Sequence, residues 1–238
     1  MSDNALIALQ PAFIIHTRSY RDTSLLVDFF TLHHGRLRAV VKGARASTKQ
    51  ARLNRPTMQP FNPLLVRFGG RGSLKNLYQS EPAGSAITLM GDRLFSALYL
   101  NELLMRLLPE DQEDAALFAL YQQSLLALST DESIEFTLRQ FEFTLLRAMG
   151  YGVNLMTESH SDKPIRCNQP YRFIADQGFE CCSTNMMGKN IFTGEELIAI
   201  RQQSKSTKAL QAAKRLCRQA LAFHLGGKPL KSRELFVN

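Results

Sequence analysis

Short apolar runs, many of them alternating with polar residues, fill the first eighty positions of the chain. This period of two predicts five β-strands, at residues 12–18, 25–31, 36–42, 63–68 and 74–79. His33-His34-Gly35 marks the turn between the second and third strands. Five short strands with a long connection after the third fit a five-stranded OB-fold barrel, and a five-stranded SH3-like barrel fits the same count.

Beyond residue 81 the apolar residues recur at helical spacing. They predict helices at residues 85–108, 115–128 and 133–149, with Asp131 or Ser133 as the N-cap of the third and Gly150 at its end. Residues 151–192 are irregular and indicate a small loop-and-hairpin insert. The capping box Thr193-Gly194-Glu195-Glu196 starts a helix that continues to about residue 203, and a last helix covers about residues 207–225.

Together these elements predict an α+β chain in four parts. An N-terminal five-stranded barrel (1–80), of the OB-fold or the SH3-like type and expected to bind nucleic acid, is followed by an α-helical bundle (81–150). A small zinc-finger-like insert (151–192), expected to lack zinc, precedes C-terminal helices (193–238) that pack on the helical domain.

The net charge of +8 is divided unevenly along the chain. Residues 1–80 contain 12 Lys or Arg and three Asp or Glu, which gives +9. Residues 81–150 contain four and 11, which gives −7, and residues 151–238 contain 13 and seven, which gives +6. Such asymmetry indicates modules with different partners, and the basic modules favour polyanions.

The strongest sign of function is a stretch from Phe29 to Ser80 that contains ten Lys or Arg and no Asp or Glu. In an extended strand Arg36 and Arg38 project from one face while Leu37 projects from the other, so the cations can follow a phosphate backbone. The alternative to a DNA-binding role is that these cations form a basic face that contacts only solvent. The candidate DNA contacts are Arg36, Arg38, Lys42, Arg45, Lys49, Arg52, Arg67, Arg71 and Lys75, and a weaker second group is Lys228, Lys231 and Arg233.

Four aromatic residues of the same region, Phe29, Phe61, Phe68 and Tyr78, are candidates for stacking on unpaired bases. Aromatic side chains in a small barrel are mostly core, so each one by itself is better explained as structural. Gly69-Gly70-Arg71-Gly72 lacks the spacing of a phosphate-binding P-loop and indicates a hairpin turn that lifts Arg71.

The remaining chemistry-bearing residues do not form a recognisable catalytic or metal motif. Cys167 stands alone, Cys181 and Cys182 are adjacent, and paired C-x2-C knuckles are missing, so we expect no zinc, although His160 is a further possible ligand. Cys217 lies inside a predicted helix, and we expect it to pack as a small apolar residue. No nucleotide-hydrolysis, HExxH or G-x-S-x-G motif occurs, so we expect a binding protein and no enzyme.

We expect a cytoplasmic protein. The chain has no run of about 18 apolar residues, and its first residues lack the charged flank and apolar region of a signal peptide.

Several motifs, in this order, resemble the RecO family of bacterial recombination mediators, and the proteobacterial branch in particular. They are Val41-Lys42-Gly43-Ala44-Arg45, Leu65-Val66-Arg67-Phe68-Gly69-Gly70-Arg71-Gly72, Leu98-Tyr99-Leu100-Asn101-Glu102-Leu103-Leu104, Arg139-Gln140-Phe141-Glu142, Met149-Gly150-Tyr151-Gly152 and Gly226-Gly227-Lys228-Pro229-Leu230-Lys231-Ser232-Arg233-Glu234-Leu235. Each block is modest alone, but together they extend almost from end to end of the chain.

The resemblance implies an OB-fold, a helical bundle and an insert that carries zinc in some members; the cysteines here depart from that pattern. It also implies DNA repair and recombination in the RecF pathway, at the bacterial nucleoid. Members bind single- and double-stranded DNA, anneal complementary strands without ATP, and help load recombinase onto strands coated by single-strand-binding protein, with RecR as partner. The alternatives are an RNA- or ribosome-associated OB-fold module, and a nuclease or glycosylase with an unrecognised site.

The acidic C-terminal tail of single-strand-binding protein needs an apolar pocket edged by a cation. Arg139, flanked by Phe136 and Phe143 at helical spacing, resembles the region that binds this tail in related proteins. The alternative is that both rings are core and Arg139 pairs with Glu135 or Glu142. Three cations of the last helix are further candidates for this role: Lys214, Arg215 and Arg218.

Overall fold

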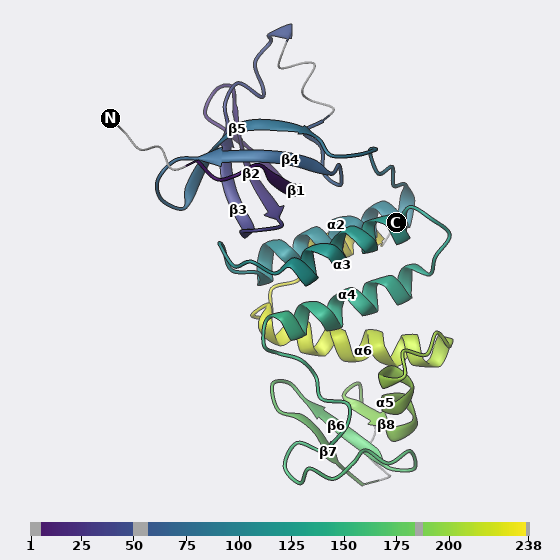
Figure 1. Ribbon diagram of the computed structural model, residues 1–238. Helices are drawn as coiled ribbons and strands as arrows, with labels where there is room; N and C mark the ends of the chain where they lie inside the picture. The colour runs from purple at the N-terminus through teal and green to yellow at the C-terminus, as the bar shows by residue number, and fades with distance from the viewer. Residues whose placement is uncertain (1–5, 50–56, 184–187, 237–238) are drawn as a thin grey trace. The chain divides into compact units, whose positions relative to one another are not determined.

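The computed structural model describes residues 6–49, 57–183 and 188–236. The chain divides into two compact units, one made of residues 1–131 and 230–238 and the other of residues 132–229. We call them the barrel unit and the helix–sheet unit and describe each by itself (Figure 1).

The barrel unit begins with a closed five-stranded barrel in the order β1-β2-β3-β5-β4. The strands are β1 (Gln10–Tyr20), β2 (Ser24–Thr31), β3 (Gly35–Val41), β4 (Leu64–Gly69) and β5 (Leu74–Pro82). β3 pairs in parallel with β5, and β1 closes the barrel on β4. This order, with its crossover between β3 and β5, is that of an OB-fold and decides against the SH3-like alternative.

Alternation fixes which side of each strand faces the inside of the barrel. Val27, Phe29, Leu37 and Phe68 are among the side chains of the barrel core, and all are almost completely buried. In β3, Arg36 and Arg38 alternate with the buried Leu37 and Ala39, as the sequence predicted.

In the part of the chain that the structure describes, the barrel unit also contains the helices α2 (Gly91–Leu107) and α3 (Ala115–Leu128) and the short 3-10 helix η1 (Lys231–Phe236). Phe13 and Phe30, which are paired across β1 and β2, pack on Phe118 and Tyr121 of α3 with ring centroids 5.2–5.7 Å apart. The helix predicted from residue 85 begins at Gly91 instead, because Gly91 has a φ of 54°, which an α-helix cannot continue through.

In the described residues, the helix–sheet unit contains a three-stranded sheet, which α5 and α6 adjoin, and the helix α4 (Figure 1). The strands are β6 (Pro170–Ile174), β7 (Gly178–Cys181) and β8 (Ile191–Thr193), with β6 in the centre; the helices are α4 (Ile134–Ala148), α5 (Gly194–Arg201) and α6 (Thr207–His224). α4 packs on α6, and α5 follows β8 directly. The predicted capping box is present, since Thr193 and Glu196 each accept a hydrogen bond from the other's backbone N–H.

The observed units differ from the predicted four-part division. We predicted that the helices of residues 81–150 form one domain, whereas α2 and α3 belong to the barrel unit and α4 to the helix–sheet unit. Apolar periodicity shows that a helix has a buried face but does not say which element covers it.

Candidate nucleic-acid interface

One end of the barrel carries exposed cations from two separate loops. Val41 pairs with Leu25 in the β2–β3 ladder, so β3 ends beside the β1–β2 turn. The backbone N–H of Arg45 donates to the carbonyl oxygen of Thr23 at 2.8 Å, which ties the loop after β3 to that turn. As a result the loop that carries Lys42 and Arg45 adjoins the turn that carries Arg21, and all three side chains are exposed. We call Arg21, Lys42 and Arg45 the barrel-end cations.

The barrel-end cations lie at the end of the barrel opposite to α3. Leu25 stands five residues before Phe30 on β2, about 17 Å along an extended strand. Phe30 contacts α3, whereas Leu25 pairs with the last residue of β3. The helix α3 therefore lies at one end of the barrel, and the β1–β2 turn and the loop after β3, which carry the barrel-end cations, lie at the other.

Arg36 and Arg38, in contrast, are paired with acids. Arg38 Nε donates to Asp28 Oδ1 at 3.0 Å, and Arg36 Nη1 lies 3.8 Å from the same oxygen. Both guanidinium groups also approach Glu110 Oε1, at 3.3 Å from Arg38 and 3.6 Å from Arg36. Asp28 is only 2% exposed, and a buried carboxylate is costly without such partners. The two arginines thus hold Asp28 and the α2–α3 connection, which changes our view of them as phosphate contacts.

The pairing of Asp28 with Arg38 could have been predicted from the sequence, but a count of the charged residues between Phe29 and Ser80 did not include Asp28. Asp28 lies one position before the acid-free stretch, and it faces Arg38 directly across the β2–β3 ladder. Extending the ladder outward from the His33-His34-Gly35 turn places these two residues opposite each other. Glu110 was not predictable in this way, because it comes from a distant helix connection.

A second group of predicted contacts lies on the β4–β5 hairpin. Arg67 and Arg71 are exposed, and Lys75 Nζ donates to the carbonyl oxygen of Gly70 at 3.4 Å. The Tyr78 ring lies so close to Gly69 that a Cβ there would be 2.5 Å from Tyr78 Cε2. Gly69 therefore makes room for the Tyr78 ring, which rests beside the hairpin.

Of the four aromatic residues proposed for stacking, three are core. Phe29, Phe61 and Phe68 are buried, and Phe29 packs edge-on against Phe68 at 5.1 Å. Tyr78 is 54% exposed. Within this set, Tyr78 therefore is the ring that a ligand can reach.

Two further cations of the barrel were missed by the sequence analysis. Arg18 is exposed on β1, and Arg21 lies 5.2 Å above the Tyr20 ring at the β1–β2 turn. Both lie before the acid-free stretch, and the neighbouring Asp22 makes the local charge look mixed, so the sequence analysis did not select them. Lys49 is exposed in the loop after β3, and Arg52 lies outside the described residues.

The weaker predicted group near the C-terminus is divided between the two units. Lys228 belongs to the helix–sheet unit, whereas Lys231 and Arg233 belong to the barrel unit. Lys231 starts η1, and its backbone N–H donates to Glu102 Oε1 at 2.9 Å. Two bonds from Ser232 complete this contact, from its N–H at 2.8 Å and its hydroxyl at 2.6 Å, both to Glu102 Oε2.

The predicted tail-binding arginine is buried in α4. Arg139 is 7% exposed, and its Nη2 donates to Glu142 Oε1 at 2.6 Å, as in the alternative in which it pairs with a neighbouring carboxylate. Phe136 and Phe143 are half-buried. Cys217 beside this pair is also buried, so this part of the unit is closed to solvent. Burial raises the pKa of the Cys217 thiol, and the nearby Glu142 charge acts in the same direction.

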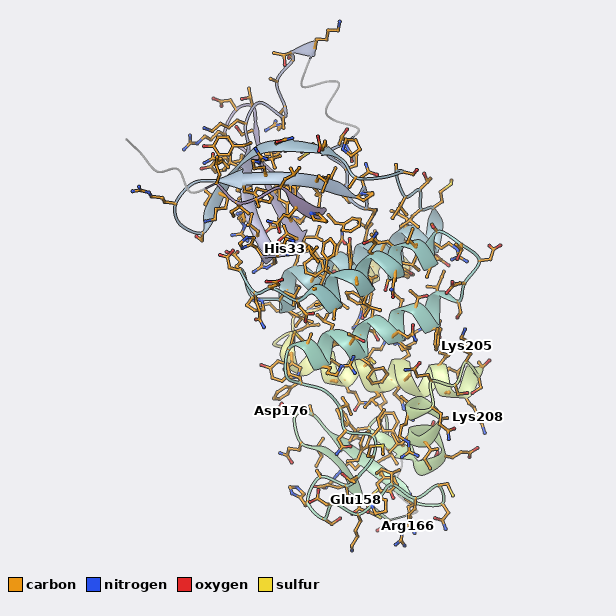
Figure 2. All side chains as sticks on the ribbon, in the orientation of Figure 1. His33, Glu158, Arg166, Asp176, Lys205 and Lys208 are labelled. Carbon is orange, nitrogen blue, oxygen red and sulfur yellow. The ribbon has the colours of Figure 1, made fainter. Side chains whose placement is uncertain are left out.

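The alternative cations of α6 have mixed surroundings. Lys214 Nζ is 2.5 Å from Glu135 Oε1, and Arg215 pairs with Glu196 at 3.0 Å while lying 4.4 Å above the Phe192 ring. Arg218 is exposed. A cation that we did not single out, Lys205, lies 4.6 Å above the Phe136 ring. Lys205 and Lys208 both project outward near the start of α6 (Figure 2).

The cysteines do not form a metal centre in the described part of the chain. Cys167 and Cys181 are exposed, Cys182 is half-buried and Cys217 is enclosed in α6. His160 Nε2 lies 3.1 Å from Glu180 Oε1. Among the described residues, no three His, Cys, Asp or Glu side chains are placed to hold one ion. These residues are not gathered into a zinc site within the described ranges, and the metal content stays a prediction.

Comparison with known proteins decides the family. The chain matches the family model for the RecO N-terminal domain over residues 6–86 and for the RecO C-terminal domain over residues 90–234. The chain belongs to the RecO family. A DNA repair protein RecO from Pseudomonas putida is 47% identical over 95% of this chain and 96% of its own length. A relative of the same name from Psychromonas ingrahamii is 42% identical over 95% of this chain and 96% of its own length. Another from Tolumonas auensis is 44% identical over 96% of this chain and 94% of its own length.

Membership in the RecO family confirms the resemblance drawn from the motifs and assigns the chain to DNA repair and recombination. No helix in the described residues is long and apolar enough to cross a bilayer.

Proposed function

We propose that the protein is a recombination mediator of the RecF pathway that binds single- and double-stranded DNA and anneals complementary strands without ATP. The observation that carries the proposal is the set of barrel-end cations on an OB-fold barrel. Cations that neutralise phosphates bind DNA of any sequence, which a mediator requires. The proposed activity forms no covalent bond, so it needs no catalytic centre.

Annealing requires that two polyanions approach each other. A protein surface that releases counterions from both strands lowers their mutual repulsion without consuming a nucleotide. The sequence contains no P-loop, since Gly226-Gly227-Lys228 is followed by Pro229 rather than Ser or Thr. We place this activity in the cytoplasm, at the nucleoid.

We further propose that the protein helps load recombinase onto strands coated by single-strand-binding protein, with RecR as partner, and that it binds the acidic tail of the coating protein at the start of α4 and α6. The half-buried Phe136 ring offers an apolar contact, and Lys205 lies 4.6 Å above it. Lys208 is exposed on the next turn and adds charge for the acidic residues. Arg139 lies one turn further along α4 and supports the site from within rather than meeting the tail.

The decisive experiment is annealing of complementary DNA strands coated with single-strand-binding protein. We expect the protein to speed annealing without ATP, and the Lys42→Ala, Arg45→Ala double variant to lose most of this effect. A matched Arg201→Ala, Lys189→Ala variant, which removes two exposed cations elsewhere, controls for net charge. If complementary RNA strands anneal equally fast and coated DNA does not anneal, the protein is an RNA-binding module instead.

A further inference from the structure

Three aromatic rings meet in the helix–sheet unit, far along the sequence from the barrel. Tyr151 follows α4, and its ring stacks on that of His224 at the end of α6, with centroids 3.7 Å apart and planes 18° from parallel. The Phe223 ring stands nearly perpendicular to His224, at 5.2 Å and 89°. We call Tyr151, Phe223 and His224 the aromatic step.

The aromatic step is open to solvent. Phe223 is 56% exposed and Tyr151 is 44% exposed. Single exposed apolar residues are common, whereas adjoining exposed rings form a contiguous apolar surface of the kind found at binding sites. Gly150 and Gly226 adopt positive φ values of 84° and 62° just beyond α4 and α6, so both helices end here and the chain turns away from the rings.

The aromatic step also brings together two of the sequence motifs that do not take part in the barrel interface. Tyr151 lies within Met149-Gly150-Tyr151-Gly152, and His224 stands two residues before Gly226-Gly227-Lys228-Pro229. The two motifs are more than seventy positions apart in sequence, and the ring stack brings them together.

Charge around the aromatic step favours an anionic ligand. The helix–sheet unit, residues 132–229, contains 13 Lys or Arg and nine Asp or Glu. Arg147 is exposed in the last turn of α4, and a Cβ on Gly152 would lie 3.6 Å from its Cγ, so the base of the Arg147 side chain lies beside the residue that follows Tyr151. Lys228 is exposed four residues after His224.

One acid acts against this charge. Asp176, on the β6–β7 turn, projects from the sheet (Figure 2), and its carboxylate raises the pKa of His224. Burial has the larger effect and lowers the pKa of His224 from its ordinary value of 6.5. The imidazole ring is therefore mainly neutral at neutral pH and presents an aromatic face rather than a charge.

We infer that the aromatic step is a second DNA contact, which takes an unpaired base by stacking on the exposed rings of Tyr151 and Phe223 while Arg147 and Lys228 meet the flanking phosphates. This inference rests on the proposed function. Base–aromatic stacking tolerates any sequence, as does the phosphate binding of the barrel. Bases of an intact duplex are already stacked, so the site selects single strands and holds them with bases turned away from solvent.

The chain contains no tryptophan, which allows a direct test. The Phe223→Trp variant carries one indole at the aromatic step. We expect its fluorescence to be quenched by an oligothymidine, with a titration that follows the binding curve measured by anisotropy. Leu126→Trp places the indole at an exposed position on α3 and serves as the control, which we expect to keep its emission. Unchanged emission from the Phe223→Trp variant at saturating DNA would overturn the inference.

A second measurement separates base stacking from phosphate binding. The Tyr151→Leu, Phe223→Leu variant keeps apolar volume but removes two aromatic rings. We expect it to bind oligothymidine about tenfold more weakly, the loss of about one stacked base. An abasic oligonucleotide of equal length keeps the phosphates and should bind wild type and variant alike. Equal loss on both ligands, or no loss on either, contradicts a stacking site.

The outcomes distinguish the inference from the proposed function. If the wild-type protein binds oligonucleotides and the Lys42→Ala, Arg45→Ala variant weakens that binding, the proposed function holds. Unquenched tryptophan and unchanged binding by the leucine variant then refute the aromatic step alone. If the wild-type protein binds neither the oligothymidine nor a duplex, both are refuted.

Discussion

At the scale of single residues, the partner of each cation decides what it does. Arg36 and Arg38 were counted with Lys42 and Arg45 because all four lie in one acid-free stretch. The structure commits the first two to Asp28 and Glu110 and leaves the other two exposed beside the β1–β2 turn. Charge in a sequence is therefore a poor measure of charge available to a ligand.

This difference leads to opposite expectations for two double variants. Lys42→Ala, Arg45→Ala should weaken binding to all DNA sequences and reduce the slope of log affinity against log salt by about 1.4 on single strands, because two phosphate contacts are lost. Arg36→Ala, Arg38→Ala should instead lower the free energy of unfolding, on the order of 3 kcal/mol, because the buried Asp28 loses two of its cations. Salt titrations and urea denaturation measure the two effects. A normal fold with a strongly reduced salt slope in the second variant would return Arg36 and Arg38 to the interface.

The helix–sheet unit offers a parallel contrast between Arg139 and Lys205. Arg139→Ala removes the guanidinium that pairs with the buried Glu142 and should destabilise the protein by roughly 3 kcal/mol. Lys205→Ala should leave the fold intact and weaken binding of the acidic tail peptide, by about 1 kcal/mol for a partly exposed charge contact. Thermal denaturation and anisotropy with a labelled peptide separate the two. Full tail affinity in a folded Lys205→Ala variant places the tail elsewhere.

Among the elements of secondary structure, α2 and η1 are joined by hydrogen bonds although they lie far apart in the sequence. Glu102 of α2 accepts three hydrogen bonds from Lys231 and Ser232, which fixes the start of η1 in the barrel unit. Phe236 of η1 packs edge-on against Phe95 of α2 at 5.7 Å. A polar anchor and an aromatic contact thus hold the same short helix at both of its ends.

The anchor predicts a dependence of stability on pH. Partial burial would raise the pKa of Glu102, but the bonds from Ser232 and Lys231 and the charge of Arg106 together lower it below 4.5. The charged form is thus stabilised by folding, and this stability is present above pH 4.5 and lost as the pH falls through the lower, folded-state pKa. Urea denaturation at pH 6 and pH 4 should show a smaller change in Glu102→Gln than in wild type. Equal changes would mean that Glu102 is not the source.

The insert of β6, β7 and β8 allows a prediction about metal. Its hydrogen-bonded sheet and the packing of Phe173, Phe179 and Phe192, with ring centroids 5.3 and 5.9 Å apart, give it a small core of its own. We expect the purified protein to contain no stoichiometric zinc, as measured by elemental analysis after purification without added metal. About one zinc per chain would show that Cys167, Cys181, Cys182 and His160 had been misinterpreted.

At the scale of the whole molecule, folding redistributes the charge blocks seen along the sequence. The block at residues 81–150 carries −7, but α2 and α3 lie with the basic barrel and α4 lies with the basic α6. The helix–sheet unit carries 13 basic and nine acidic residues, and the barrel unit carries the remaining 16 and 12, so each unit has a net charge of +4. Neither unit is acidic, and both are suited to a DNA partner.

Local patterns in the sequence were enough to predict the β-strands of the barrel, most helix bounds, the capping box of α5 and the family. Each of these is encoded locally: alternation sets strand faces, caps stop helices, and motifs such as Met149-Gly150-Tyr151-Gly152 lie in short continuous stretches. Lys42 and Arg45, which we predicted as DNA contacts, are exposed in the structure, and their role in binding stays a prediction.

The packing of the folded chain was needed to establish which unit each helix joins, which acids contact Arg36 and Arg38, and where distant rings meet. Glu110 reaches Arg36 and Arg38 from a helix connection some seventy residues away, and Tyr151 meets His224 across a similar separation. Such pairs depend on how buried faces pack, and packing is non-directional, so many partners satisfy the same apolar pattern. The sequence therefore predicts that a helix or strand face is buried, or that a charged side chain is present. The tertiary structure is needed to show which group that face or side chain contacts.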